Sequence, residues 1–120
     1  EILLYYTSVL NSPLRGVFHC FSGDKEFLQT ILNLGFYVGF DGNITFKNAK
    51  ELQKIGKIAP LEKILLETDS PFLSPEPYRG LRNEPKNVKI IAEFLVKLKG
   101  VSFKKTAQIT SQNAKTLFKI

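Results

Sequence analysis

Hydrophobic and polar residues alternate along the chain with two different periods, and each change of period marks a new element. Apolar residues spaced three and four positions apart predict helices over residues 1–10, 24–34, 48–58, 85–100 and 103–118. Short runs rich in aromatic and β-branched residues predict strands over residues 15–21, 36–40 and 63–67. The pattern therefore predicts one helix, then strands and helices in alternation, then two helices, with a long irregular loop over residues 68–84.

Capping and turn residues support these boundaries. Asp24 is placed to cap the second helix, Gly35 to end it, and Pro60 lies just beyond the third helix. Pro85 suits the first turn of the next helix, for which Asn83 is the expected cap. No internal repeat or linker divides the sequence, so we treat residues 1–120 as belonging to a single domain.

The alternation of strands and helices predicts a parallel sheet, because parallel neighbours need a crossover and a helix is the usual one. A three-stranded sheet with helices on one side leaves its other face bare, whereas a closed barrel of eight strands buries both faces. Such a barrel takes about 250 residues, and the chain has 120. We therefore predict an α/β fold equal to about half of a TIM, or (β/α)8, barrel, with parallel strands and outer helices.

The composition is that of a folded domain with an excess of basic residues. Hydrophobic residues make up 43% of the chain, and 17 basic against 11 acidic residues give a formal net charge of +6. This excess favours a polyanionic partner, and solvation by lysines explains it equally well. Cys20 is the only cysteine, so a reducing cytoplasm is the expected compartment. No apolar stretch approaches the roughly 20 residues of a membrane span, and the lack of any methionine suggests a fragment.

Candidate chemistry lies where two strands end. In parallel α/β folds, sites form at the carboxyl ends of strands, and His19 and Asp69 stand at the ends of the first and third predicted strands. An imidazole and a carboxylate there often begin a metal site, although a lone histidine is more often a satisfied polar residue. Asp69 could equally act as a ligand, as a general base or as a residue that orders the loop.

The neighbours of these two residues are weaker candidates. Strand alternation puts His19 and Cys20 on opposite faces, so Cys20 should pack against helices if His19 faces a site. Glu67 is expected to point away from the site, which makes it a weaker ligand than Asp69.

The loop that follows Asp69 supplies candidate substrate-binding residues, namely Tyr78, Arg79 and Arg82. A guanidinium group can bind phosphate oxygens through two parallel hydrogen bonds, and a tyrosine can stack on a base or a sugar. The alternative is that the arginines form surface ion pairs with Glu76 and Glu84.

Several motifs, in order along the chain, resemble those of the TatD family of metal-dependent hydrolases. They cover the chain from about residue 15 to residue 118 and include H-C-F-S-G at 19–23, G-F-Y-V-G-F at 35–40, I-T-F-K-N-A at 44–49, L-E-T-D-S-P at 66–71, R-G at 79–80 and N-E-P at 83–85. The resemblance implies a distorted TIM barrel of the amidohydrolase type, of which residues 1–120 are the C-terminal part. It also implies deoxyribonuclease or phosphodiesterase activity on DNA, with two divalent ions (Mg²⁺, Mn²⁺ or Zn²⁺) at the carboxyl ends of the strands.

The same resemblance implies roles for two residues. His19 is similar to the family's histidine at the end of the sixth strand, which helps to hold one of the metals. Asp69 is similar to its aspartate after the eighth strand, which binds the other metal and can contact the attacking water, so Asp69 is the candidate catalytic residue. In that mechanism the metals lower the pKa of the bound water and polarise the phosphoryl oxygen.

The chain also departs from the family pattern. The family's H-x-H pair near the first strand, its bridging glutamate and its histidine after the fifth strand have no counterpart in these residues. Two ligands fall short of the three or four that a stable site normally uses. We therefore expect the chain alone to bind metal weakly and to hydrolyse nothing. The expected partners are DNA, or another nucleic acid, and the missing N-terminal half of the barrel. We expect no membrane partner.

Two other interpretations stay open. A non-catalytic half-barrel module could use Arg79, Arg82 and the lysines to hold nucleic acid or a partner chain. A hydrolase of the same fold could instead act on a non-nucleic ester or amide, since a fold does not fix the substrate.

Overall fold

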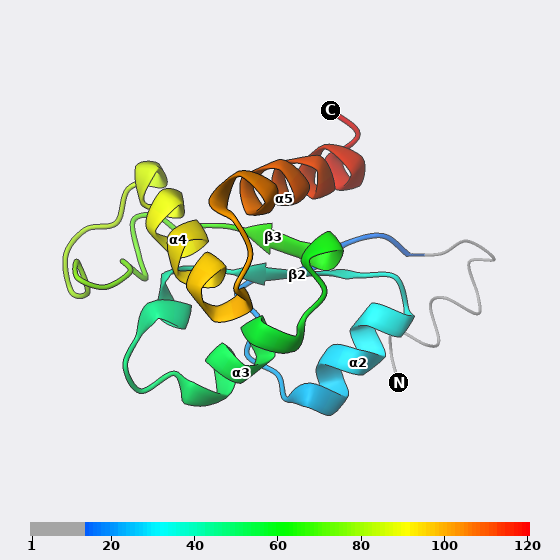
Figure 1. The fold of residues 1–120 in the computed structure, drawn as a ribbon, viewed down its shortest axis with the longest axis horizontal. Coiled ribbons are helices and arrows are strands. Elements are labelled where there is room, and N and C mark those ends of the chain that lie inside the picture. Colours follow the sequence, from blue (N-terminus) through cyan, green and yellow to red (C-terminus); the bar gives the residue numbers. More distant parts are fainter. Residues whose placement is uncertain (1–13) are drawn as a thin grey trace.

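The computed structural model describes residues 14–120, in which three short strands lie between helices (Figure 1). The strands are β1 (Val17–Phe18), β2 (Tyr37–Phe40) and β3 (Ile64–Leu66). The helices are α2 (Lys25–Asn33), α3 (Lys50–Ile58), α4 (Val88–Lys99) and α5 (Phe103–Phe118), with short 3₁₀ helices at Gly42–Thr45, Leu61–Lys63 and Pro85–Asn87. The helix predicted over residues 1–10 lies outside the described residues.

The strands form one parallel sheet in the order β1-β2-β3, as the alternation of elements predicts. Its register pairs Phe18 with Val38 and Val38 with Ile64, so the three strands run side by side in the same direction. Their carboxyl ends consequently share one edge of the sheet. The segments that follow the strands, from residues 19, 41 and 67 onward, all leave from that edge.

The first strand is shorter than the predicted range of residues 15–21. It stops at Phe18 because the chain turns at His19 and Cys20, where Cys20 has a φ of +47°. Pairing with β2 resumes beyond the turn, since the N–H of Phe21 donates to the carbonyl of Gly39 at 3.0 Å. The turn therefore bulges out of a ladder that is otherwise maintained on both sides of it.

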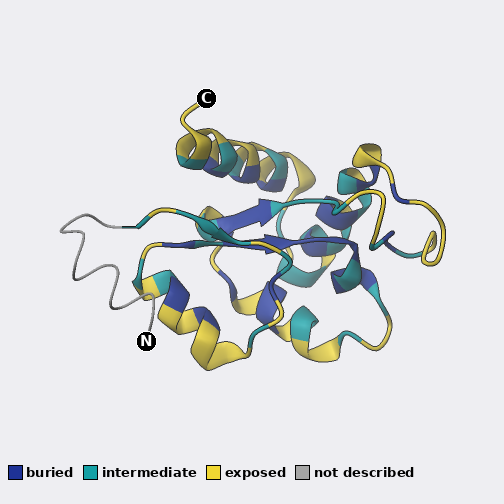
Figure 2. Cartoon of the chain, turned by 180° about the vertical axis from the view of Figure 1, so that it is seen from behind, coloured by how far each residue is buried: buried dark blue, intermediate teal, exposed yellow. Residues whose placement is uncertain are grey.

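The core lies between the sheet and the helices. Figure 2 shows the deepest burial along β2 and β3, and exposed residues on the outer surfaces of α2 and α5. Strands and helices contribute alike to the fully buried side chains, which include Val38, Phe40, Ile64, Ile31, Ile91 and Leu95. Each such side chain stabilises the fold by about 1.5–3 kcal/mol relative to exposure. The helical period of apolar residues in the sequence arises from these buried helix faces. The predicted ranges therefore match the observed helices to within three residues at each end, for α2, α3, α4 and α5.

Capping is confirmed at the second helix and wrong at the fourth. Asp24 Oδ1 accepts a hydrogen bond from the N–H of Phe27 at 2.8 Å, as an N-cap should. Asn83 does not cap α4, because the 3₁₀ helix Pro85–Asn87 stands between it and the first turn of α4. Its side chain is used elsewhere.

Two polar side chains tie distant elements together. Asn113 of α5 is buried and its Nδ2 donates to the carbonyls of Leu61 and Ile64 at 2.9 and 2.8 Å, at the beginning of β3. Lys99, at the end of α4, extends its ammonium to the last turn of α3 and donates to three backbone carbonyls there, those of residues 56, 57 and 59. Within residues 14–120, no helix combines the length and the apolar character that crossing a membrane requires.

Candidate metal centre

His19 lies between two carboxylates at the shared edge of the sheet. Its Nδ1 is 2.8 Å from Glu67 Oε1, and its Nε2 is 3.5 Å from Asp69 Oδ1. The imidazole is about half exposed, whereas the Glu67 carboxylate is largely covered. The structure thus brings His19 and Asp69 together, as their positions at strand ends predict, and adds Glu67 to them.

The electrostatics of this cluster favour a charged imidazole when no cation is nearby. The hydrogen bond to Glu67 and the negative charge of that residue raise the pKa of His19 above its ordinary value of 6.5. Partial burial opposes this shift, and the charges of Asp69 and Asp41 add to it. Each ring nitrogen of His19 faces a carboxylate, so the cluster stabilises a positive charge at this position.

The prediction that Glu67 points away from the site is wrong. Glu67 and Asp69 are two positions apart, and residues two apart in an extended chain share a side. Gly39 of β2 leaves the space that the Glu67 side chain occupies, since a Cβ at Gly39 would lie 2.7 Å from Glu67 Oε2. Glu67 Oε1 also accepts a hydrogen bond from the backbone N–H of Cys20 at 2.6 Å, which holds the turn that carries His19.

Cys20 does not pack against the outer helices as strand alternation predicts. The positive φ at this residue ends the alternation, and its sulfur accepts a weak hydrogen bond from Asn43 Nδ2 at 3.6 Å, in the segment after β2. Burial raises the pKa of the Cys20 thiol to about 12, and the nearby carboxylate of Asp41 adds to the shift. The thiol is therefore protonated at neutral pH when no cation is nearby, and a protonated thiol is a weak nucleophile.

Asp41 is a residue beside the cluster that the sequence analysis does not consider. It follows β2 and is fully buried, with Oδ1 accepting from the N–H of Asn43 at 3.2 Å. Its Oδ2 has no hydrogen-bond partner among the described residues, which is costly for a buried carboxylate oxygen. The signal was available, because Asp41 is a carboxylate placed directly after a buried strand, like Asp69.

Asp69 stands in a turn that begins the long loop. Its φ is +54°, a left-handed conformation that is uncommon outside glycine, and its carbonyl accepts from the N–H of Phe72 at 2.8 Å. Asn83 donates to the carbonyls of Thr68 and Phe72, one before the turn and one at its end. The loop is thus fixed by hydrogen bonds even though it contains no helix or strand over residues 67–84.

The predicted substrate-binding residues lie farther along this loop and are exposed. The Arg79 guanidinium lies over the ring of Phe46, 4.0 Å from its centroid, and 3.5 Å from Asn48 Oδ1. Tyr78 and Arg82 are exposed as well. In the described part of the chain, neither arginine forms a salt bridge, and none of these three residues bonds to His19 or Asp69.

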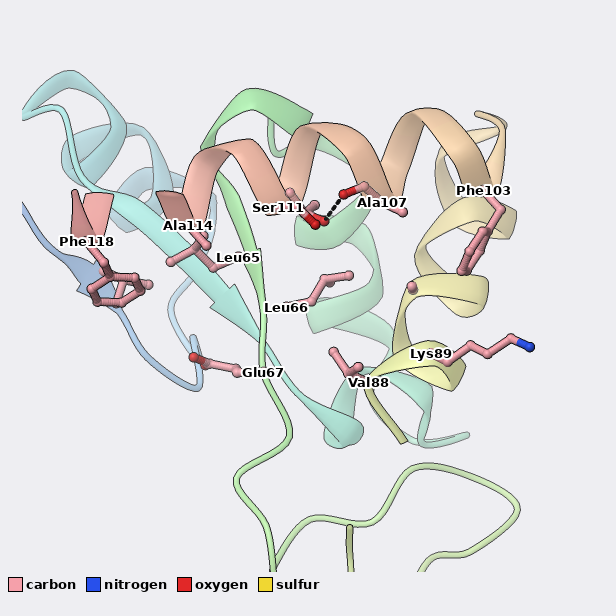
Figure 3. Close-up of a pocket in the computed structure, with 13 residues that line it drawn as sticks. Leu65, Leu66, Glu67, Val88, Lys89, Phe103, Ala107, Ser111, Ala114 and Phe118 are labelled. Atoms are coloured by element: carbon pink, nitrogen blue, oxygen red, sulfur yellow. Dashed lines mark hydrogen bonds between the residues drawn. The ribbon is translucent and has the colours of Figure 1, made fainter. Parts of the chain in front are cut away.

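An apolar groove of about 660 Å³ lies beside β3 and ends at Glu67 (Figure 3). Leu65 and Leu66 of β3 line it together with Ala107 and Ala114 of α5, and Figure 3 shows Ala114 beside Leu65. Within the described residues, β3 pairs only with β2, so its other edge is free. The groove therefore joins an unpaired strand edge to the candidate metal centre.

The side-chain donors at this edge of the sheet are of the types that bind a divalent cation, although few of them point to one position. Imidazole nitrogen with carboxylate oxygen is a common ligand set for Zn²⁺ and Mn²⁺, and the buried, unpartnered oxygen of Asp41 adds negative potential nearby. Among residues 14–120, no three His, Cys, Asp or Glu side chains form a group that could hold a metal ion. The assignment of His19 and Asp69 to two different ions stays a prediction.

A family model described as TatD related DNase matches residues 1–119. The chain belongs to this family. Among curated relatives of this TatD-family chain, it is 47% identical over 105 residues to the uncharacterized metal-dependent hydrolase YabD of Bacillus subtilis. It is 46% identical over 105 residues to the uncharacterized metal-dependent hydrolase YcfH of Escherichia coli. These matches cover 88% of the chain but only 41% and 40% of the relatives, so the chain spans about two fifths of their length.

Solved structures agree with the TatD assignment. The E. coli TatD homologue YjjV superposes with a TM-score of 0.82 at 30% identity, covering 88% of the chain and 40% of that structure. A TatD-family hydrolase of Entamoeba histolytica superposes with a TM-score of 0.83 at 26% identity, covering 97% of the chain and 46% of that structure. The predicted family is confirmed, and so is the predicted α/β fold as part of a TatD-type TIM barrel.

Proposed function

We propose that the chain belongs to a divalent-metal-dependent hydrolase that cleaves DNA phosphodiesters. The observation that supports this most is His19 held between Glu67 and Asp69 at the carboxyl edge of a parallel sheet. Membership of the TatD-related DNase family and the names of the relatives as metal-dependent hydrolases support the same class of reaction.

Each residue of the cluster has a distinct part in this proposal. His19 Nε2 and the Asp69 carboxylate would be ligands, and Glu67, by accepting from Nδ1, would fix the tautomer that leaves Nε2 free to bind. Divalent ions, when bound, would lower the pKa of a water and polarise the phosphoryl oxygen. Asp69 would also orient the attacking water and accept its proton, which makes it the proposed catalytic residue.

The proposed substrate is DNA, bound through the loop that follows Asp69. Arg79 and Arg82 are exposed cations without salt-bridge partners in the described structure, and Tyr78 is an exposed aromatic ring beside them. Guanidinium groups bind phosphate oxygens, and aromatic rings stack on bases. The formal net charge of +6 would favour association with a polyanion.

The proposed partner of this chain is the rest of the barrel. Its supports are the free edge of β3, the apolar groove beside that edge and the match to only two fifths of the relatives' length. A further parallel strand with apolar side chains would pair with β3 and fill the groove, and its carboxyl end would reach the neighbourhood of Glu67. Ligands beyond His19 and Asp69 would then come from that partner.

Cleavage assays on the protein as its gene encodes it test the function. We expect single-stranded DNA to be cut with Mg²⁺, Mn²⁺ or Zn²⁺ present, and Asp69→Asn to lower the rate by about 100-fold or more. Glu51→Gln, which neutralises an exposed carboxylate on α3, is the control and should leave the rate unchanged.

Other outcomes favour other functions. Turnover of small esters, amides or phosphodiesters without cleavage of DNA would indicate a hydrolase of a different substrate class. Salt-dependent DNA binding without any turnover would indicate the non-catalytic module, which the lack of a three-ligand group among residues 14–120 favours.

A further inference from the structure

Asn83 makes every hydrogen bond that its side chain allows. It is almost completely buried, with 2% of its surface exposed. Its Nδ2 donates to the carbonyls of Thr68 and Phe72 at 2.6 and 2.7 Å. Its Oδ1 accepts from the N–H of Glu84 and from Nδ2 of Asn87, both at 2.9 Å. Two donor hydrogens and two acceptor lone pairs are the full capacity of an amide, so nothing is left unused.

The two carbonyls that Asn83 holds bracket Asp69. Thr68 immediately precedes Asp69, and Phe72 ends the turn that Asp69 begins. The N–H of Asn83 also donates to the carbonyl of Pro71 at 2.9 Å, which adds a third bond to the same short segment. One residue therefore anchors the turn on both sides of the candidate ligand.

The turn needs such an anchor because its backbone conformation is strained. Asp69 and Leu73 have φ values of +54° and +52°, a region that residues other than glycine occupy at a cost in free energy. Conformations of this kind persist only where the surrounding structure over-determines them. Within the turn, the Asp69 carbonyl accepts from Phe72, and Thr68 Oγ1 accepts from the N–H and the hydroxyl of Ser70. Among the described residues, the hydrogen bonds that join the backbone of residues 68–72 to a residue outside this segment come from Asn83.

We propose that Asn83 is the positioning residue that holds the Asp69 carboxylate beside His19. Without the two Nδ2 bonds, the turn is free to leave the left-handed conformation, and the Asp69 Oδ1 then moves from its place 3.5 Å from His19 Nε2. Asn83 touches neither substrate nor metal in this role and acts through the backbone of residues 68–72. The consequence for metal affinity rests on the proposed function, whereas the consequence for the turn does not.

Asn113 offers a matched control for the same chemistry elsewhere. It is also buried, with 7% of its surface exposed, and its Nδ2 also donates to two backbone carbonyls. Those carbonyls belong to Leu61 and Ile64, at the opposite end of β3 from Asp69. Asn113→Ala thus removes the same number of donor hydrogens from a similarly buried place. If Asn83 contributes only to the global stability of the fold, both substitutions should have the same effects.

The experiment compares Asn83→Ala with Asn113→Ala in the protein as its gene encodes it, at a temperature where both remain folded. Hydrogen exchange of the Phe72 amide, which bonds to the Asp69 carbonyl, reports whether the turn opens. We expect exchange there to be about tenfold faster in Asn83→Ala than in Asn113→Ala. Calorimetric titration with Mn²⁺ or Zn²⁺ is expected to show affinity weakened about 10- to 100-fold by Asn83→Ala and changed less than threefold by Asn113→Ala.

Each outcome decides the matter. Equal exchange at Phe72 in the two variants, or equal loss of metal affinity, overturns the positioning role. If the wild-type protein binds no metal, the proposed function fails, and exchange at Phe72 still decides the role of Asn83. If Asn83→Ala does not fold, Asn83→Asp replaces it, because a carboxylate keeps the bonds to Glu84 and Asn87 and repels the two loop carbonyls. The same tenfold faster exchange is then expected, and its absence refutes the proposal.

Discussion

Replacing Gly39 by alanine tests whether Glu67 is the residue that holds His19. A Cβ at Gly39 would lie 2.6 Å from Glu67 Cδ and closer still to Oε1. Gly39 is a strand residue without a positive φ, so alanine suits the backbone of β2. The atoms in the way are the end of a flexible side chain, and we therefore expect the carboxylate to move while the sheet stays intact.

The size of the effect follows from the distances. Ordinary van der Waals contact begins near 3.4 Å, so Glu67 Cδ must move outward by about 0.8 Å and Oε1 by more. That displacement stretches the 2.8 Å bond from His19 Nδ1 beyond hydrogen-bonding range, and the bond from the Cys20 N–H is lost with it. The loss costs about 1–2 kcal/mol, and about 0.5 kcal/mol is recovered because alanine restricts the unfolded chain. We expect a Tm lower by a few degrees.

Proton NMR titration of the metal-free chain measures the result directly. His19 is the only histidine in the sequence, so the imidazole signals of the spectrum can be assigned to it directly. We expect the pKa of His19 to lie above 6.5 in the wild type and to fall toward 6.5 in Gly39→Ala, because Glu67 is the largest cause of the raised pKa. A raised pKa stabilises the fold fully below 6.5, and this stabilisation is lost as the pH rises through the folded-state pKa. The stability difference between the two proteins should therefore be larger just below pH 6.5 than in alkaline solution.

Glu67→Gln separates loss of charge from crowding. This substitution removes the charge without adding an atom, and it should lower the pKa of His19 as Gly39→Ala does. Adding Gly39→Ala to Glu67→Gln should produce no further shift, since the interaction is already gone. A wild-type titration curve in Gly39→Ala would refute the assignment of the raised pKa to Glu67. Global unfolding of Gly39→Ala would refute the argument that the Glu67 side chain moves while the sheet stays intact.

Three further predictions concern the rest of the structure. Gly42→Ala should destabilise by several kcal/mol, because its Cβ would meet backbone, including the Pro75 nitrogen at 2.8 Å, and chemical denaturation would show a lower midpoint or no fold. Lys99→Met should lower the free energy of unfolding by about 1–2 kcal/mol through loss of three carbonyl contacts at the end of α3, whereas Lys97→Met, on the exposed side of α4, should change it little. Cys20, with a thiol pKa of about 12, should react with iodoacetamide near pH 8 roughly 100-fold more slowly in the folded chain than in urea, and equal rates would contradict its burial.

The helices and the order of the strands could be predicted because their signals are local. A helix such as α5 shows its buried face every three or four residues, and the predicted range 103–118 is the range observed. The parallel pairing followed from the crossover rule, which depends only on the order of elements. The meeting of His19 and Asp69 followed in turn, because parallel strands end at one edge.

The rest of the site could not be predicted because the pattern rules stop where the backbone turns. Strand alternation misplaced Cys20 because its φ of +47° breaks the period of two. The role of Asn83 was misassigned because its bonds to Thr68 and Phe72 span 15 and 11 residues, far beyond the reach of a capping rule. Glu67 was misassigned although the period of two itself places it on the same side as Asp69.

The bonds of Asn113 make the order of synthesis matter for this molecule. The carbonyls of Leu61 and Ile64 receive their donor from a residue that follows them by 52 and 49 positions. During translation, the two carbonyls at the beginning of β3 therefore wait for their donor until residue 113 has been added to the chain. Contacts between residues so far apart in the sequence form late in folding, because a long loop must be closed first. A ribosome-bound chain that ends before α5 therefore lacks both Asn113 bonds at the beginning of β3, although it already contains Asn83 and the turn around Asp69.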